Sequence, residues 1–137
     1  FRSHTHTNDS ITAFIPEDNV LFTGDLLFAK CHPFIAHGDI ANWQKVLNAS
    51  AETTTAKIIP GHGPLSGKQD LLDMAAYIQA FDTLATELSV GKKPEDAMAV
   101  AQELIPRLPE QGRAPESFMM VVMNLQMKYL APPAPEK

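Results

Sequence analysis

The sequence predicts an α/β fold for this chain of 137 residues, because two regions of different texture follow one another. Residues 1–66 contain short β-rich runs and one helix pattern, whereas residues 67–130 show helical apolar periodicity almost throughout. Residues 131–137 are rich in proline, and we expect a disordered tail there. A chain of this length is expected to form one domain with a substantial core.

The first region contains three predicted strands. Residues 11–15 and 20–22 are β-rich, and the turn-forming residues 16–19 between them predict a hairpin. Asp39 suits the N-cap of a helix that runs to about Ser50, with apolar residues on one face. Residues 57–59 predict a short buried strand that stops at Pro60-Gly61, since proline donates no ladder hydrogen bond.

The second region predicts three helices. Ser66 and Gln69 have the spacing of a capping box, and the apolar run that follows ends at Gly91. Pro94 and Pro115 suit the first positions of the second and third helices. Along the third helix we expect an apolar stripe of Phe118, Val121, Val122, Leu125 and Tyr129, with Met119, Met120, Met123 and Met127 as core or interface filler.

The bulk composition excludes several function classes. The net charge of −5 argues against a nucleic-acid or anionic-membrane partner, because no basic excess is present to neutralise phosphates. No apolar run approaches the roughly 20 residues of a membrane-spanning helix. The single cysteine, Cys31, excludes an internal disulfide framework. We expect Cys31 to be a buried small residue rather than a nucleophile, since no base is assigned to it.

Three strings at predicted strand ends carry the residues that suggest chemistry. They are residues 4–10 (His-Thr-His-Thr-Asn-Asp-Ser), residues 22–25 (Phe-Thr-Gly-Asp) and residues 60–64 (Pro-Gly-His-Gly-Pro). Imidazole and carboxylate together suit zinc and related divalent metals. Gly24 removes side-chain bulk beside Asp25, and Gly61 and Gly63 permit a sharp reversal around His62. These residues predict a metal site at one end of the sheet.

In this order, the three strings resemble the second half of the metallo-β-lactamase superfamily, from about residue 3 to about residue 80. The resemblance implies half of a four-layer αββα sandwich with a helical C-terminal extension, in which residues 1–66 are the C-terminal half of the domain. It implies that His6, Asp25 and His62 are metal ligands. Asp25 would be the catalytic, metal-bridging residue of a two-metal site. The implied cofactor is zinc, with iron or manganese as alternatives.

Four other residues near these strings are candidates for supporting roles. His4 lies two residues before His6, and we expect it to be structural or to orient a ligand rather than to bind metal. Asp9 suits either an orienting partner of His6 or an Asx turn. For His32 and His37 we expect solvated loop histidines, with substrate contact as the alternative.

The chain departs from the family in one respect, because it lacks the His-x-His-x-Asp-His signature that supplies four further ligand positions. We therefore expect that the chain, which opens at Phe1, enters in mid-domain and is inactive alone. The expected partner is the missing N-terminal half or a second copy in a homo-oligomer. The bare inner face of the sheet would then include either Ile11, Ala13 and Ile15 or Thr12 and Phe14.

The implied activity of the parent protein is hydrolysis by a metal-bound hydroxide of a small ester, thioester or lactone substrate. The helical extension loosely resembles that of the glyoxalase II group. One alternative is β-lactam hydrolysis, although the commonest zinc β-lactamases carry cysteine at the position of Asp25. The alternative from another class is a non-catalytic half-domain that self-associates or binds a partner.

Overall fold

The computed structural model describes residues 2–53, 56–109, 113 and 115–131. Residues 132–137 of the predicted tail lie outside this part of the chain. Within the described residues, no helix combines the length and the apolar character needed to cross a membrane.

The first part of the chain contains the strands and α1, and the part after β5 is helical. This arrangement confirms the α/β prediction. A two-stranded sheet pairs β1 (Arg2–Ser3) with β2 (Ser10–Ile11). A three-stranded sheet has the order β3-β4-β5, with β3 (Ala13–Ile15), β4 (Val20–Phe28) and β5 (Lys57–His62). The helices are α1 (Ile40–Thr53), α2 (Lys68–Leu88), α3 (Ala97–Leu104) and α4 (Phe118–Asn124), and a π-helical turn, Leu125–Tyr129, continues α4.

The predicted hairpin is present. β3 and β4 are antiparallel with Ile15 opposite Val20. The turn between them closes through a hydrogen bond from the Asn19 amide to the Pro16 carbonyl, 3.3 Å, and Asn19 adopts a φ of 50°. β4 continues beyond the predicted end at Phe22 and reaches Phe28, so it becomes the central strand of the sheet.

The prediction that the third strand stops at Pro60 was wrong, because β5 continues to His62. β5 is an edge strand that pairs in parallel with β4. An edge strand tolerates proline, since the missing amide then interrupts no second ladder.

Asp39 caps α1 as predicted, because its carboxylate accepts a hydrogen bond from the Asn42 amide, 3.0 Å. The capping box predicted for Ser66 and Gln69 was wrong. The backbone of Ser66 pairs instead with Ile58, through two hydrogen bonds of 2.8 and 2.9 Å, and is held outside the helix. The Asp70 carboxylate accepts from the Gly67 amide, 2.9 Å, at the start of α2.

The last two helices begin with short 3-10 turns, Pro94–Asp96 and Pro115–Ser117, so both prolines open helical segments as predicted. The predicted stripe of α4 packs inward through Val121, Val122 and Leu125. The methionines predicted as filler do not all pack in the core: Met119, Met123 and Met127 are exposed.

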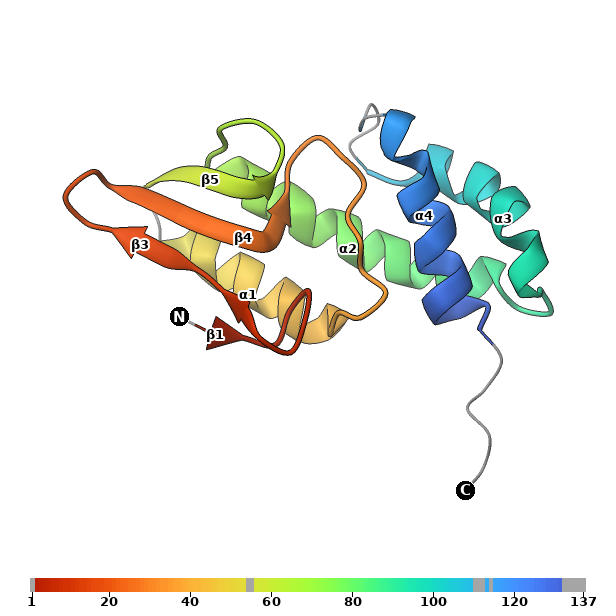
Figure 1. The fold of residues 1–137 in the computed structure, drawn as a ribbon. Helices are drawn as coiled ribbons and strands as arrows, with labels where there is room; N and C mark the ends of the chain where they lie inside the picture. The colour runs from red at the N-terminus through yellow and green to blue at the C-terminus, as the bar shows by residue number, and fades with distance from the viewer. Residues whose placement is uncertain (1, 54–55, 110–112, 114, 132–137) are drawn as a thin grey trace, which may run out of the picture.

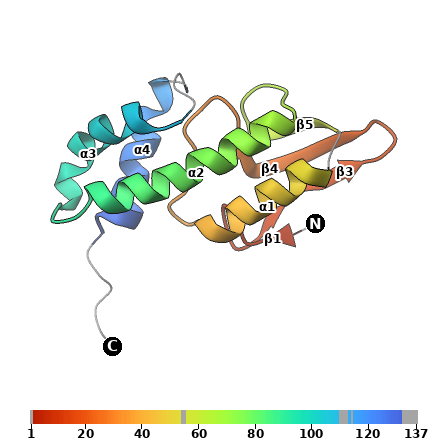
Figure 2. The ribbon, with the colours of Figure 1, turned by 180° about the vertical axis from the view of Figure 1, so that it is seen from behind.

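Helices cover only one face of the three-stranded sheet. In Figure 1 the sheet lies in front of α1 and α2, and Figure 2 shows these two helices from behind, lying across the sheet. Cross-strand neighbours share a face, so the register groups Phe14, Leu21 and Ile58 on the helix side. Ile58 is fully buried there.

The opposite face, which we call the open face, carries two other cross-strand sets: Ala13, Phe22 and Ile59, and next to them Ile15, Val20 and Lys57. Ile15, Phe22 and Ile59 are 39%, 40% and 38% exposed. The sequence left two sets open for the bare face, one with Ala13 and Ile15 and one with Phe14. The register places Ala13 and Ile15 on the open face and Phe14 on the helix side. Ile11 belongs to β2 in the other sheet.

The C-terminal helical segment holds the loop of residues 29–39, which follows β4. Asn124, fully buried, accepts from the Ile35 amide, 2.8 Å, and donates to the Pro33 carbonyl, 2.7 Å. Lys128 donates to the Gly38 carbonyl, 3.1 Å. These contacts join residues far apart in the sequence, and both figures show the loop running between the sheet and α4.

The expectation that His32 is a solvated loop histidine was wrong. His32 is buried, and its Nδ1 lies 2.7 Å from the hydroxyl of Tyr77 in α2. Its backbone amide donates to the hydroxyl of Ser117, 2.9 Å. The guanidinium of Arg113 lies 4.4 Å from the centre of the Tyr77 ring. Burial, and secondarily the Arg113 charge, lowers the pKa of His32 to about 4.

This burial predicts a specific loss of stability in acid. Between pH 6.5 and 4, His32 is protonated more fully in the unfolded chain than in the folded chain. Protons therefore favour unfolding in this range, and the free energy of unfolding falls as the pH falls from 6.5 to 4. The contribution of His32 to this loss is about 3 kcal/mol at most. Denaturant unfolding across this range should show a shallower pH dependence for His32→Gln than for wild type.

The matched control is His37→Gln, which changes an exposed histidine of the same loop. Because the His37 side chain is exposed, this change should cost little stability at neutral pH. Equal slopes for wild type and His32→Gln would contradict the assignment.

Candidate metal centre

Asp25 lies where the pairing of β4 with β5 becomes irregular. Gly24 faces Pro60 and Phe28 faces His62, so four steps along β4 correspond to two along β5. Such irregularities disrupt the ladder locally and redirect side chains. Gly24 adopts a φ of 52°, in the region that favours glycine, and a Cβ there would lie 3.2 Å from the Ile11 carbonyl oxygen. The irregular stretch places Asp25 at the end of the sheet beside His62.

Gly61 and Gly63 serve two different purposes on the other strand. A Cβ on Gly61 would collide with the Asp25 carboxylate and the Gly24 backbone, so this glycine permits close approach rather than a turn. Gly63 has a φ of 106° and makes the reversal. The His62 carbonyl accepts from the Ala29 amide, 2.9 Å, which fixes the strand end. The predicted reversal around His62 thus comes from Gly63 alone.

Asp25 contacts both histidines that the sequence singled out with it. Its Oδ1 lies 3.2 Å from Nε2 of His62, and its Oδ2 lies 3.8 Å from Nδ1 of His6. The three residues come from β4, from the end of β5 and from the bend between β1 and β2. Each carboxylate oxygen therefore faces a different imidazole.

His6 sits in an aromatic wall. Its ring centre lies 5.6 Å from Phe28, 5.6 Å from Trp43 and 6.1 Å from Phe34. Trp43 is itself oriented, because its indole N–H donates to the Leu26 carbonyl, 2.8 Å.

Burial lowers the pKa of His6 below its ordinary value, although the nearby Asp25 carboxylate partly offsets this. His62 and His37 add smaller lowering effects. A lowered pKa favours the neutral imidazole, which is the form that binds metals.

The donor set fits zinc in chemistry, since imidazole nitrogen and carboxylate oxygen are its common ligands. The side chains form two pairs: His62 with one Asp25 oxygen, and His6 with the other. Among the described residues, no group of three or more His, Cys, Asp or Glu side chains is arranged to hold one metal ion. The trio therefore fits two incomplete metal positions that share a carboxylate, rather than one complete position.

A pocket of about 340 Å³ opens beside Asp25 and His6. Its other lining residues are Thr7, Asp9, Ser10, Ile11 and Gly24. A neighbouring pocket of similar size shares Thr7 and Asp9 and includes His37. Substrate-sized space is thus present next to the carboxylate.

Four other residues that the sequence analysis considered, His4, Asp9, His37 and Cys31, lie outside the contacts of Asp25 described above. His4 is exposed, and its carbonyl accepts from the Asn42 side chain, which ties this segment to α1. Asp9 is exposed, and its amide contacts the Thr7 hydroxyl, 3.4 Å, within a local turn. His37 is exposed, with its ring edge-on to Phe34. Burial raises the pKa of the Cys31 thiol, which is half-buried, and this disfavours a nucleophilic thiolate.

Sequence reasoning missed Phe28 as part of the centre. Its ring stacks on His62, with centres 4.5 Å apart and planes within 4°. In the sequence, Phe28 is only one member of the apolar run that follows Asp25. Its position opposite His62 depends on the register of β4 with β5, which the sequence does not give. Trp43 was predicted merely as a member of the apolar face of α1.

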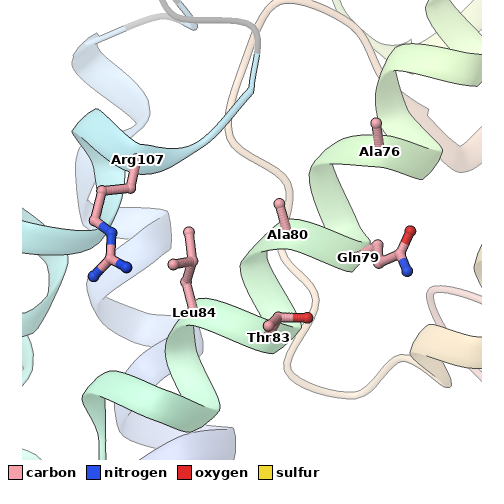
Figure 3. A pocket seen from close by; sticks show the side chains of 6 residues that line it. All are labelled: Ala76, Gln79, Ala80, Thr83, Leu84 and Arg107. Atoms are coloured by element: carbon pink, nitrogen blue, oxygen red, sulfur yellow. The ribbon is translucent and has the colours of Figure 1, made fainter.

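Another pocket, of about 410 Å³, lies on the outer side of α2 (Figure 3). Small and polar side chains of α2 line it together with Arg107, which pairs loosely with Glu87 at 3.9 Å. Its lining contains no His, Cys, Asp or Glu, so the candidate metal centre lies beside Asp25.

Part of the chain is similar to known proteins. The family model of the metallo-beta-lactamase superfamily matches residues 1–62, a stretch that includes His6, Asp25 and His62. No curated protein matches the chain. The crystal structure of VMB-1 at pH 5.5, a metallo-beta-lactamase, is similar with a TM-score of 0.53 and 22% identity.

That similarity covers 58% of this chain and 39% of the VMB-1 chain, so the match spans well under half of the solved protein. At this identity it shows the fold, which typically binds zinc. The one-sided covering of the sheet agrees with half of a two-sheet domain. Residues 1–62 thus match the metallo-beta-lactamase superfamily model, and the fold of the chain is similar to that of a solved metallo-beta-lactamase.

Proposed function

We propose that this chain supplies half of the metal centre of a hydrolase that acts on small ester, thioester or lactone substrates. The observation that carries the proposal is the Asp25 carboxylate, whose two oxygens face His62 and His6 at 3.2 and 3.8 Å. The match of residues 1–62 to the superfamily model supports a metal-dependent hydrolase in general.

In this proposal, His6 would hold one metal ion and His62 a second ion, and Asp25 would contribute a carboxylate oxygen to each. Zinc, when bound, supplies the Lewis acid that activates water near neutral pH. The aromatic wall around His6 keeps that imidazole neutral and oriented. The chain's own residues thus fix where a metal and its water meet the substrate.

The ligand count among the described residues argues that the centre is completed from outside them. Each metal position receives one imidazole and one carboxylate oxygen here, and catalytic zinc usually has three protein ligands. A polypeptide carrying the signature His-x-His-x-Asp-His would supply the rest.

The protein part of the pocket lining offers a substrate carboxylate no lysine or arginine. Its described residues include the acidic side chains Asp9 and Asp25 and the hydroxyls of Thr7 and Ser10. A substrate carboxylate would therefore depend on the metal ions for a positive partner, whereas a neutral ester, thioester or lactone needs no such partner.

The alternative function, a self-associating half-domain, is favoured by the open face. Its apolar residues lie together on β3, β4 and β5, and soluble monomers rarely expose a contiguous apolar patch of this kind. In the absence of another half, we propose that a second copy covers this face. In a twofold-symmetric dimer, the open face of one copy would pack against the same face of the other copy.

Hydrolysis should depend on adding the other half. The 137-residue chain with zinc alone should give no measurable turnover of a neutral p-nitrophenyl ester, a thioester or a lactone. Adding a polypeptide that carries the His-x-His-x-Asp-His half should produce turnover that a chelator abolishes. Asp25→Asn should eliminate this turnover, while Asp18→Asn, the same change in the distant hairpin turn, should not.

A cephalosporin included in the same assay tests the β-lactam alternative. Preferential cephalosporin hydrolysis would overturn the proposed substrate class. Robust zinc-dependent turnover by the isolated chain would show that its centre is not half of a site.

Self-association should depend on the open face. At tens of micromolar, sedimentation of the isolated chain should show a dimer or larger species. Phe22→Lys places a charge in the centre of the open face and should shift the chain toward monomer. Leu65→Lys changes an apolar residue that is more exposed, at 67%, but lies in the loop after β5, and should leave the oligomer intact. A monomeric wild type would contradict the proposal.

A further inference from the structure

The ring of Phe28 is shared by both imidazoles of the candidate centre. It lies parallel to His62, with centres 4.5 Å apart, and tilted by 36° to His6, with centres 5.6 Å apart. Phe28 therefore contacts the two residues that face the two oxygens of Asp25. No other ring contact described in this chain involves both histidines.

The register of the sheet produces this arrangement. Phe28 is the Cα partner of His62 in the parallel β4–β5 pairing, so the two side chains lie on the same face. The Ala29 amide then donates to the His62 carbonyl, 2.9 Å, directly after the stacked pair.

Phe28 is itself held from a distant part of the chain. Its side chain is only 4% exposed, and its carbonyl accepts from the guanidinium of Arg113, 2.8 Å. Arg113 also donates to the Cys31 carbonyl, so it fixes both ends of the turn that leaves β4. The ring is therefore a rigid surface rather than a mobile side chain.

His62 has a particular need for such a surface. Its side chain is 55% exposed, whereas that of His6 is 12% exposed. An exposed imidazole samples several rotamers, and a ligand must lose that freedom when it binds. Stacking on Phe28 restricts His62 before any metal arrives.

We propose that Phe28 is a positioning residue that holds the His62 and His6 imidazoles against the two oxygens of Asp25 in a metal-ready arrangement. The inference rests on the proposed metal-dependent function and names a further residue of that same site. Its role is to lower the cost of ordering the ligands, so its removal weakens metal binding while leaving every ligand in place. An aromatic pair of this kind is worth roughly a two- to twelvefold change in an equilibrium constant, so we expect a loss of metal affinity of that size.

The test compares Phe28→Leu with Phe28→Tyr and with Phe81→Leu. Phe28→Leu keeps the site apolar but removes the stacking ring, and Phe28→Met is a second non-aromatic variant if the leucine variant does not fold. Phe28→Tyr retains the ring. Phe81→Leu is the matched control, since Phe81 is fully buried in α2 and contacts Tyr77 and Tyr129 rather than the centre.

Two measurements separate positioning from general stability. Three-bond couplings in the metal-free chain report whether His62 occupies one χ1 rotamer. A zinc titration followed on the imidazole resonances of His6 and His62 reports affinity at this site. We expect Phe28→Leu to average the His62 rotamer and to weaken zinc binding roughly two- to twelvefold. Phe28→Tyr should restore both properties, and Phe81→Leu should change neither.

Each outcome bears on one claim. If zinc leaves both imidazole resonances of the wild-type chain unmoved even when the polypeptide carrying the His-x-His-x-Asp-His half is present, the proposed function is refuted, while the rotamer measurement still decides the role of Phe28. Zinc binding of equal strength in wild type and Phe28→Leu, with His62 ordered in both, would overturn the positioning role. Equal weakening in Phe81→Leu would assign the effect to stability instead.

Discussion

The candidate centre depends on the parallel pairing of β4 with β5. Within it, a local mismatch of register brings Asp25 of β4 beside His62 at the end of β5, and the Cα partners Phe28 and His62 stack after the mismatch. The mismatch is possible because Gly24 adopts a left-handed conformation and Gly61 has no side chain to collide with Asp25. A regular ladder would alternate its side chains strictly between the two faces. The geometry around Asp25 is therefore a consequence of sheet irregularity.

The C-terminal helical segment extends this constraint. Arg113, Ser117 and Asn124 each bond to backbone of β4 or of the loop of residues 29–39. These polar groups are buried or nearly so, and a buried polar group without a partner is costly. Packing of the helices and ordering of the loop are thus coupled. The loop in turn carries Phe34, one of the three rings around His6.

Local sequence signals predicted the parts of this structure that short-range chemistry determines. The hairpin turn, the Asp39 cap and the helix-opening prolines depend on residues within a few positions of one another. The ordered strings around His6, Asp25 and His62 identified three residues that lie together in the structure.

Interactions over long sequence distances could not be predicted in the same way. The burial of His32 against Tyr77 and Arg113 joins three separate segments, and no local pattern announces it. Pro60 continued the strand because β5 is at the sheet edge, which is a property of topology. The role of Phe28 required the β4–β5 register, and the shifted cap at Gly67 followed from the pairing of Ser66 with Ile58.

The central claim is that Asp25 is shared between two metal positions, one with His6 and one with His62. Anomalous diffraction at the zinc edge, from crystals of the chain combined with a polypeptide carrying the His-x-His-x-Asp-His half, tests it most directly. The account predicts two zinc peaks, each within about 2.0–2.2 Å of an Asp25 oxygen and of one of the two imidazoles. Zinc bound elsewhere, with Asp25 outside its coordination sphere, would contradict it.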